Sequence, residues 1–206
     1  AGLRLISAPS TDAQEASALT HQYNSIAIYN NSWGPADDGQ TLIGPGPLTL
    51  AALEDGVTNG RGGRGNLYLW AAGNGLQYSD NVNYDGYANS RFTIAVGAVD
   101  YNGVQAYYSE PGAAMFITAP SRATSAVGIT TTDRLGANGY SSTDCTSQFG
   151  GTSSASPLAA GAVALMLQAN PNLGWRDVQH ILAQTAVKNN PTDSGWITNT
   201  AGFHLN

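Results

Sequence analysis

Short apolar runs and segments of helical spacing alternate along this chain. Near-continuous apolar runs are typical of strands that are buried on both faces of a sheet. Four such runs occur, at residues 26–32, 66–72, 92–99 and 114–119. Between the first two, residues 47–60 carry apolar side chains at helical spacing, with Pro47 suited to a first turn and Gly60 to a helix end. This alternation predicts an α/β fold with a parallel sheet.

Two further helices are predicted in the last quarter of the chain. Residues 152–169 are small or apolar on all sides, which predicts a helix buried at the centre of the fold. Its start is placed close to Thr152 and Ser153, because Pro157 is tolerated only near the start of a helix. Residues 175–187 form the second helix, with one apolar face. Residues 2–6 have the character of a strand, so we expect the chain to be part of a longer protein.

Composition narrows the class of protein. The 206 residues carry 8 Lys and Arg against 14 Asp and Glu, a net charge of −6, and 42% of them are hydrophobic. Binding to nucleic acid or to an acidic membrane is disfavoured, because neutralising phosphates needs clustered cations. No apolar run is long enough to span a bilayer. An acidic domain of this kind suits an extracellular protein with cationic or neutral partners. A single cysteine, Cys145, excludes an internal disulfide and a cysteine-based zinc site.

Ser153 is the first candidate for chemistry. It lies in a glycine- and serine-rich segment, residues 150–157, at the predicted start of the buried helix. The N-terminus of a helix presents unpaired N–H groups and positive potential, which stabilise an oxygen that develops negative charge. A simple helix-capping serine would give the same local pattern, so both interpretations stay open at this point.

Further polar candidates follow the ends of the predicted strands. Asn74 could donate a hydrogen bond to an oxyanion, or it could belong to a turn. Carboxylates at several strand ends could converge into one pocket for a basic side chain, a calcium ion or both, or each could be a solvated turn residue. These carboxylates are Asp37, Asp38, Asp80, Asp85 and Glu110. None of the three histidines, His21, His180 and His204, has a sequence context typical of a general base.

Five motifs stand in one order along the chain. They are NSWGPADDG at 31–39, WAAGNG at 70–75, YDGY at 84–87, GTSSASPLAAG at 151–161 and NLGWRD at 172–177. Together they resemble the kexin/furin branch of the subtilisin-like serine endopeptidases over nearly the whole chain. The resemblance implies a three-layer parallel sheet with helices on both faces, incomplete at its N-terminal side. Residues 1–206 would then be the C-terminal part of a catalytic domain.

The resemblance also implies roles for individual residues. Ser153 matches the nucleophile and Asn74 the amide of the oxyanion hole. Asp37 and Asp85 match the acids that hold an arginine or lysine before the scissile bond. Other matches concern calcium, the substrate backbone and the outer pockets for further basic residues. They are Asp37, Asp80 and Glu110 for Ca²⁺, Ser32, Trp33, Gly34 and Pro35 for the backbone, and Glu15, Asp12 and Tyr87 for the outer pockets.

The chain also departs from the family pattern. Ile43 replaces a pocket aspartate, which implies a weaker preference for a basic residue four positions before the cut. The family's Asp and His segments are absent, and a serine without its base is a weak nucleophile. We therefore expect the isolated chain to hydrolyse peptides negligibly. The implied partners are a polypeptide with basic residues and an N-terminal part of the same secreted or extracytoplasmic protease, disulfide-bonded through Cys145. The alternative is a non-catalytic fragment or pseudoprotease that binds basic peptides or another partner.

Overall fold

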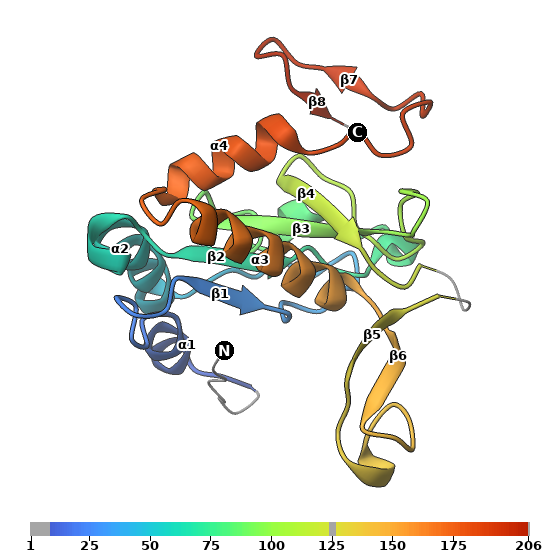
Figure 1. Ribbon diagram of the computed structural model, residues 1–206, viewed down its shortest axis with the longest axis horizontal. Coiled ribbons are helices and arrows are strands. Elements are labelled where there is room, and N and C mark those ends of the chain that lie inside the picture. Colours follow the sequence, from blue (N-terminus) through green and yellow to red (C-terminus); the bar gives the residue numbers. More distant parts are fainter. Residues whose placement is uncertain (1–8, 124–126, 206) are drawn as a thin grey trace.

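A computed structural model describes residues 9–123 and 127–205 and contains a parallel sheet with helices on both faces (Figure 1). The strand expected at residues 2–6 lies outside these ranges. Four parallel strands stand in the order β1-β2-β3-β4, which is also their order in the sequence. Their bounds are Ile28–Asn31 for β1, Leu67–Ala71 for β2, Thr93–Val99 for β3 and Met115–Pro120 for β4. All four predicted strands are therefore confirmed.

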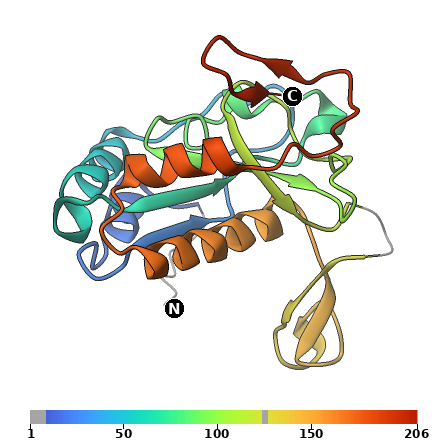
Figure 2. The ribbon, with the colours of Figure 1, turned by 45° about the horizontal axis from the view of Figure 1, so that its top comes forward.

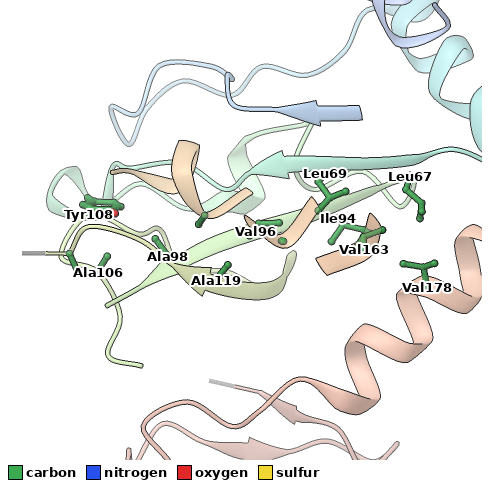
Figure 3. Packing of buried hydrophobic residues seen from close by; sticks show 13 residues of the cluster. Leu67, Leu69, Ile94, Val96, Ala98, Ala106, Tyr108, Ala119, Val163 and Val178 are labelled. Carbon is green, nitrogen blue, oxygen red and sulfur yellow. The ribbon is translucent and has the colours of Figure 1, made fainter. Parts of the chain in front are cut away.

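The central strands show why an unbroken apolar run is needed. In β2 the side chains of Leu67 and Leu69 point to one layer, while those of Tyr68 and Trp70 point to the other. The first layer holds α3 (Thr152–Ala169) and α4 (Trp175–Thr185), and Figure 3 shows its apolar packing. The second layer holds α1 (Asp12–Leu19) and α2 (Pro47–Gly63). Every residue of β2 and β3 is buried, whereas the outer strands β1 and β4 are only partly so.

Some elements were not predicted. Helix α1 is short, and its signal is a capping box in which the side chains of Thr11 and Gln14 bond each other's backbone N–H groups. Two antiparallel hairpins, three 3₁₀ helices and the last residues of α2 complete the described structure. The hairpins are β5 (Ile129–Thr132) with β6 (Cys145–Phe149) and β7 (Ile197–Thr198) with β8 (His204–Leu205), and the 3₁₀ helices are η1 (Leu76–Tyr78), η2 (Val82–Tyr84) and η3 (Gly136–Asn138). The β5–β6 hairpin projects from the body of the molecule (Figure 1).

Two helix ends agree closely with the sequence. Helical backbone in α2 breaks at Gly60, whose ψ is 156°, so the predicted stop is correct although the assigned element continues to Gly63. Helix α4 ends at Thr185, two residues before the predicted end.

The expectation that α3 is buried on all sides is wrong for the described residues. Its inner face, with Ala155, Ala159 and Val163, packs on the sheet, but Leu158 and Leu165 on the outer face are 42% and 67% exposed. The physical reason is that no described element covers this face, and Figure 2 shows α3 along the margin of the molecule. On the same side β1 is an edge strand, paired with β2 alone among the described strands.

Candidate active site

The carboxyl ends of the parallel strands and the N-terminus of α3 meet at one edge of the sheet. Ser153 is the second residue of α3, so its side chain lies in the first turn, where N–H groups are unpaired. The hydroxyl of Ser32, directly after β1, donates a hydrogen bond of 3.0 Å to the Ser153 carbonyl. The sheet therefore brings together residues that are 121 positions apart in the chain.

A glycine turn places Ser153 beside Asn74. Gly151 has a φ of 78°, which an L side chain adopts only at a cost, and a Cβ there would lie 3.2 Å from the Asn74 side-chain oxygen. This oxygen accepts hydrogen bonds from the Thr152 backbone N–H, at 2.8 Å, and from the Thr152 hydroxyl, at 3.1 Å. The orientation of the Asn74 amide is therefore fixed from its oxygen side.

The amide nitrogen of Asn74 faces the carboxylates. It donates to Asp37 Oδ2 at 3.2 Å, and the Asn74 backbone N–H donates to the same oxygen at 3.0 Å. One N–H bond of the amide remains for another acceptor, because an amide nitrogen carries two hydrogens. Asn74 thus contacts both the turn before Ser153 and the acidic group next to it.

Asp37, Asp80 and Glu110 form a compact carboxylate cluster. Each offers one oxygen, and these oxygens lie within 4.8 Å of one another. Asp80 and Glu110 are buried, and each accepts a backbone N–H, from Gly39 at 3.0 Å and from Gly75 at 2.9 Å respectively. Three convergent carboxylates are the hard oxygen ligands that calcium prefers, so the residues fit this ion.

Burial, together with neighbouring negative charge, raises the pKa of two acids at this site. Burial raises the pKa of Glu110 to about 7, and the nearby carboxylates Asp80, Asp37 and Asp85 add to the shift. Burial likewise raises the pKa of Asp85 to about 6, although its carboxylate accepts the N–H groups of Tyr87 and Ala88. A cation bound at this cluster would relieve the repulsion and favour the ionised forms.

Two other candidate acids are engaged with backbone groups. Asp38 accepts the N–H groups of Gln40 and Thr41 at 2.9 and 2.7 Å, which is the turn role left open by the sequence. Asp12 accepts the N–H groups of Leu48 and Thr49 at 2.9 and 2.8 Å, so its carboxylate lies at the N-terminus of α2. A substrate could bond only to the carboxylate lone pairs of Asp38 and Asp12 that these backbone N–H groups leave free.

The segment after β1 lies between the carboxylates and an aromatic cluster. The ring of Trp33 contacts Trp70 and Tyr87, with centroid distances of 4.7 and 5.0 Å. The Tyr87 hydroxyl donates to buried Glu15 at 2.9 Å. Gly34 lies so close to Asp85 that an added Cβ would be 2.9 Å from its carboxylate oxygen. Pro35 lines a small cavity together with Asp37 and Asp85.

Comparison with known proteins gives the family. A model of the subtilase family matches residues 4–203 of the 206. This chain belongs to the subtilase family. Proprotein convertase subtilisin/kexin type 7 of Mus musculus is 48% identical over 204 residues, which are 98% of this chain and 26% of the relative. A dibasic-processing endoprotease of Schizosaccharomyces pombe is 44% identical over 210 residues, 100% of this chain and 28% of the relative. The chain thus spans about a quarter of the length of these relatives.

The solved structures agree with the subtilase fold. A serine protease of Aeromonas sobria, crystallised with its chaperone, has a TM-score of 0.79 and 22% identity, covering 98% of this chain and 41% of that protein. The predicted subtilisin-like α/β fold with helices on both faces is therefore confirmed. In the described part of this subtilase chain, no helix is both long enough and apolar enough to cross a membrane.

The structure of this subtilase chain brings most of the predicted site residues together, and it also shows partners that the sequence analysis missed. Thr152 links Asn74 to the Gly73 N–H, and Tyr108 and Ser121 contact Gly151 from the other side. The only sequence signal was a run of hydroxyl residues next to a glycine turn. Within residues 9–123 and 127–205, no histidine forms a hydrogen bond with Ser153. Cys145 is exposed on β6 and forms no disulfide within this chain.

Proposed function

We propose that this chain is the C-terminal part of the catalytic domain of a serine endopeptidase that cleaves after basic residues. The observation that carries the proposal is the position of Asn74. Its side-chain oxygen is held by the turn before Ser153, while its nitrogen reaches Asp37 of the carboxylate cluster. The proposed nucleophile, the proposed oxyanion donor and the carboxylates therefore lie next to one another. The names of the relatives, a proprotein convertase and a dibasic-processing endoprotease, support the same class.

In this proposal Ser153 attacks the scissile carbonyl. A bond forms between Ser153 Oγ and the carbonyl carbon, and the hydroxyl proton goes to a histidine base supplied by an N-terminal part of the same protease. The free N–H of the Asn74 amide and the first turn of α3 stabilise the oxyanion. The C–N bond then breaks, the base returns its proton to the leaving amine, and water hydrolyses the acyl-enzyme. Without that base the isolated chain has negligible activity.

The proposed specificity rests on acidic and edge residues. Asp37 and Asp85 hold the arginine or lysine before the scissile bond. The segment Ser32, Trp33, Gly34 and Pro35 pairs with the extended substrate backbone. Glu15 and Tyr87 contribute to outer pockets, whereas Asp12 contributes less because it caps α2. Ile43, which is 54% exposed, provides no charge for a basic residue four positions before the cut.

Calcium is the proposed cofactor, held by Asp37, Asp80 and Glu110. The ion would supply positive charge that keeps these carboxylates ionised and the loops that carry them in place. Its role is structural, so the acyl-transfer chemistry rests on Ser153, Asn74 and the base.

The N-terminal part of the same protease is the proposed partner. It covers the exposed apolar face of α3, which includes Leu158 and Leu165, and it pairs with the edge of β1 that no described strand occupies. Exposed Cys145 forms a disulfide with it. We call the resulting complex the assembled protease and place it on a secretory route, outside the cytoplasm.

The test is hydrolysis of matched peptides by the assembled protease in calcium. We expect peptides with Arg or Lys before the scissile bond to be cleaved at least about 100-fold more efficiently than the Leu counterpart, because Leu leaves the half-buried Asp37 and Asp85 without a cationic partner. Ser153→Ala should abolish cleavage, while Ser147→Ala on β6 serves as a matched control. The non-catalytic alternative predicts that basic peptides bind but are not cleaved, and that a serine-directed phosphonate does not label Ser153. The observation in favour of this alternative is that no described histidine bonds Ser153.

A further inference from the structure

A cluster of buried hydroxyl groups surrounds the turn before Ser153. We call Tyr108, Ser121 and Ser154 the hydroxyl network. Their exposed fractions are 7%, 6% and 1%. Ser121 Oγ lies 2.8 Å from the Tyr108 hydroxyl and 2.7 Å from Ser154 Oγ, so the three oxygens follow one another at hydrogen-bonding distance. Each hydroxyl carries one hydrogen, so these contacts alternate with the bonds to neighbouring carbonyls and do not all form at once. In Figure 3 Tyr108 lies at the opposite end of the apolar cluster from Val178.

The hydroxyl network contacts both polar groups of the Gly151 peptide backbone. The Gly151 N–H donates to the Tyr108 hydroxyl at 3.1 Å. The Gly151 carbonyl accepts from Ser121 Oγ at 2.8 Å and from Ser154 Oγ at 3.1 Å. The Tyr108 hydroxyl in turn donates to the Arg122 carbonyl at 2.9 Å. The turn is therefore attached to the loop after β4 through side chains.

The glycine at this turn needs such support. Gly151 has a φ of 78°, and glycine has more conformational freedom than any other residue. Two residues later the chain reaches Ser153, and the intervening Thr152 N–H bonds Asn74. A rotation of the Gly151 peptide would therefore move both Ser153 and the donor that orients Asn74.

We infer that the hydroxyl network positions Ser153 for acyl transfer, with Tyr108 and Ser121 as positioning residues. This inference rests on the proposed function. Because the network is buried, a lost hydrogen bond leaves a polar group without a replacement from water. The turn would shift to satisfy that group, and small misplacements of reacting groups reduce rates steeply. Substrate binding at the carboxylate cluster involves none of the three hydroxyls.

The experiment compares two tyrosine substitutions in the assembled protease. Tyr108→Phe removes the network hydroxyl and keeps the ring. Tyr68→Phe is the matched control, because the Tyr68 hydroxyl is also buried and bonded to a carbonyl, that of Leu19 at 2.9 Å, in the opposite layer. We expect both variants to lose similar thermal stability. Only Tyr108→Phe should lower kcat, by about tenfold, with KM within about twofold of wild type.

Serine substitutions provide a second, graded series. Ser121→Ala should match Tyr108→Phe, since Ser121 contacts both other hydroxyls and the Gly151 carbonyl. Ser154→Ala should lower kcat by less than about threefold, because Ser121 still donates to that carbonyl. The rate at which a phosphonate labels Ser153 should also fall more for Ser121→Ala than for Ser154→Ala.

The outcomes separate the two proposals. One outcome would overturn the positioning role alone. In it, wild-type turnover depends on Ser153, but Tyr108→Phe and Ser121→Ala both keep the kcat of the control Tyr68→Phe. A parallel fall in kcat for Tyr108→Phe and Tyr68→Phe would also overturn it, because a general loss of stability would then explain the effect. Absence of any Ser153-dependent turnover or labelling in the wild-type assembled protease would overturn the proposed function, and the positioning role with it.

Discussion

Asn74 connects two parts of the site that are far apart in the sequence. Its backbone follows β2, its side-chain oxygen is fixed by Thr152 of α3, and its nitrogen contacts Asp37 from the loop after β1. A donor held on both sides needs no reorganisation when charge develops on a bound carbonyl. This is the condition under which a single hydrogen bond contributes most to catalysis.

Removal of the Asn74 amide should therefore affect turnover more than binding. For Asn74→Ala in the assembled protease we expect kcat to fall by about 10²–10³-fold with KM nearly unchanged. Steady-state kinetics on a peptide with Arg before the scissile bond gives both constants. Asn102→Ala, in an exposed turn that contains Asp100, should retain wild-type kinetics. A loss expressed only in KM would assign Asn74 to substrate binding instead.

Residue types at the site were largely predictable from the sequence, but their partners were not. Asn74, Asp37, Asp80 and Glu110 were identifiable because parallel strands end at one edge and polar residues follow these ends. No sequence pattern points to Tyr108 or Ser121, because they contact Gly151 only through tertiary contacts across 43 and 30 positions respectively. The bonds from Asp12 to the start of α2 are unpredictable for the same reason, because they join residues 36 and 37 positions apart.

At the scale of elements, the length and character of an apolar run decided what could be predicted. The sequence predicts the observed bounds of helix α3 because the helix is long, has a glycine before it and has a proline, Pro157, near its start. Helix α1, of 8 residues with little amphipathic character, and the β5–β6 hairpin were missed. Short polar elements depend on caps and pairings, which a periodicity search does not detect.

Arg61 links elements that are far apart in the sequence. Its guanidinium donates to the carbonyls of Gly65 and Leu173, each at 3.1 Å, and to that of Pro171 at 3.3 Å, so it links the end of α2 to the loop between α3 and α4. We expect Arg61→Ala to lower the free energy of unfolding by about 2 kcal/mol, since three carbonyls lose a charged donor.

Urea unfolding of the chain measures this effect, and Arg91→Ala is the control. Arg91 forms one long ion pair with Glu54, 3.9 Å, and both side chains are more than half exposed. Such a surface pair contributes little, so Arg91→Ala should leave stability within about 0.5 kcal/mol of wild type. Equal effects of the two substitutions would argue against a linking role for Arg61.

For the whole molecule, the outer face of α3 tests the proposed association with an N-terminal part. Leu165 is 67% exposed on that face. We expect Leu165→Glu to leave the unfolding of the isolated chain nearly unchanged and to weaken assembly by at least about tenfold, because a buried charge would lack a partner. Leu48→Glu on α2, where Leu48 is 54% exposed, should leave assembly unaffected. Native mass spectrometry measures the association of each variant with the N-terminal part. If Leu165→Glu and Leu48→Glu weaken association equally, the partner does not bind at the outer face of α3.

The carboxylate cluster makes the stability of the whole molecule depend on pH and calcium together. The pKa of Glu110 is raised to about 7 and that of Asp85 to about 6 by burial and neighbouring carboxylates. In the unfolded chain both titrate near about 4. Between these values the folded chain holds more protons than the unfolded one, so stability falls as pH rises. Without calcium, the stability that the protonated forms of Glu110 and Asp85 contribute is fully present below about pH 4 and is lost by about pH 7.

Calcium should reverse that dependence. An ion bound by Asp37, Asp80 and Glu110 favours the ionised carboxylates, so we expect the melting temperature in calcium to rise from pH 5 to pH 7, where in chelator it falls. Glu110→Gln removes one ligand and one titrating group, and it should abolish most of the calcium response while flattening the profile in chelator. Asp55→Asn on α2 is the control, because Asp55 is a half-buried acid outside the cluster that accepts a hydrogen bond from Asn59. It should leave the pH profile in calcium and the pH profile in chelator unchanged. Parallel profiles with and without calcium would show that the cluster binds no such ion.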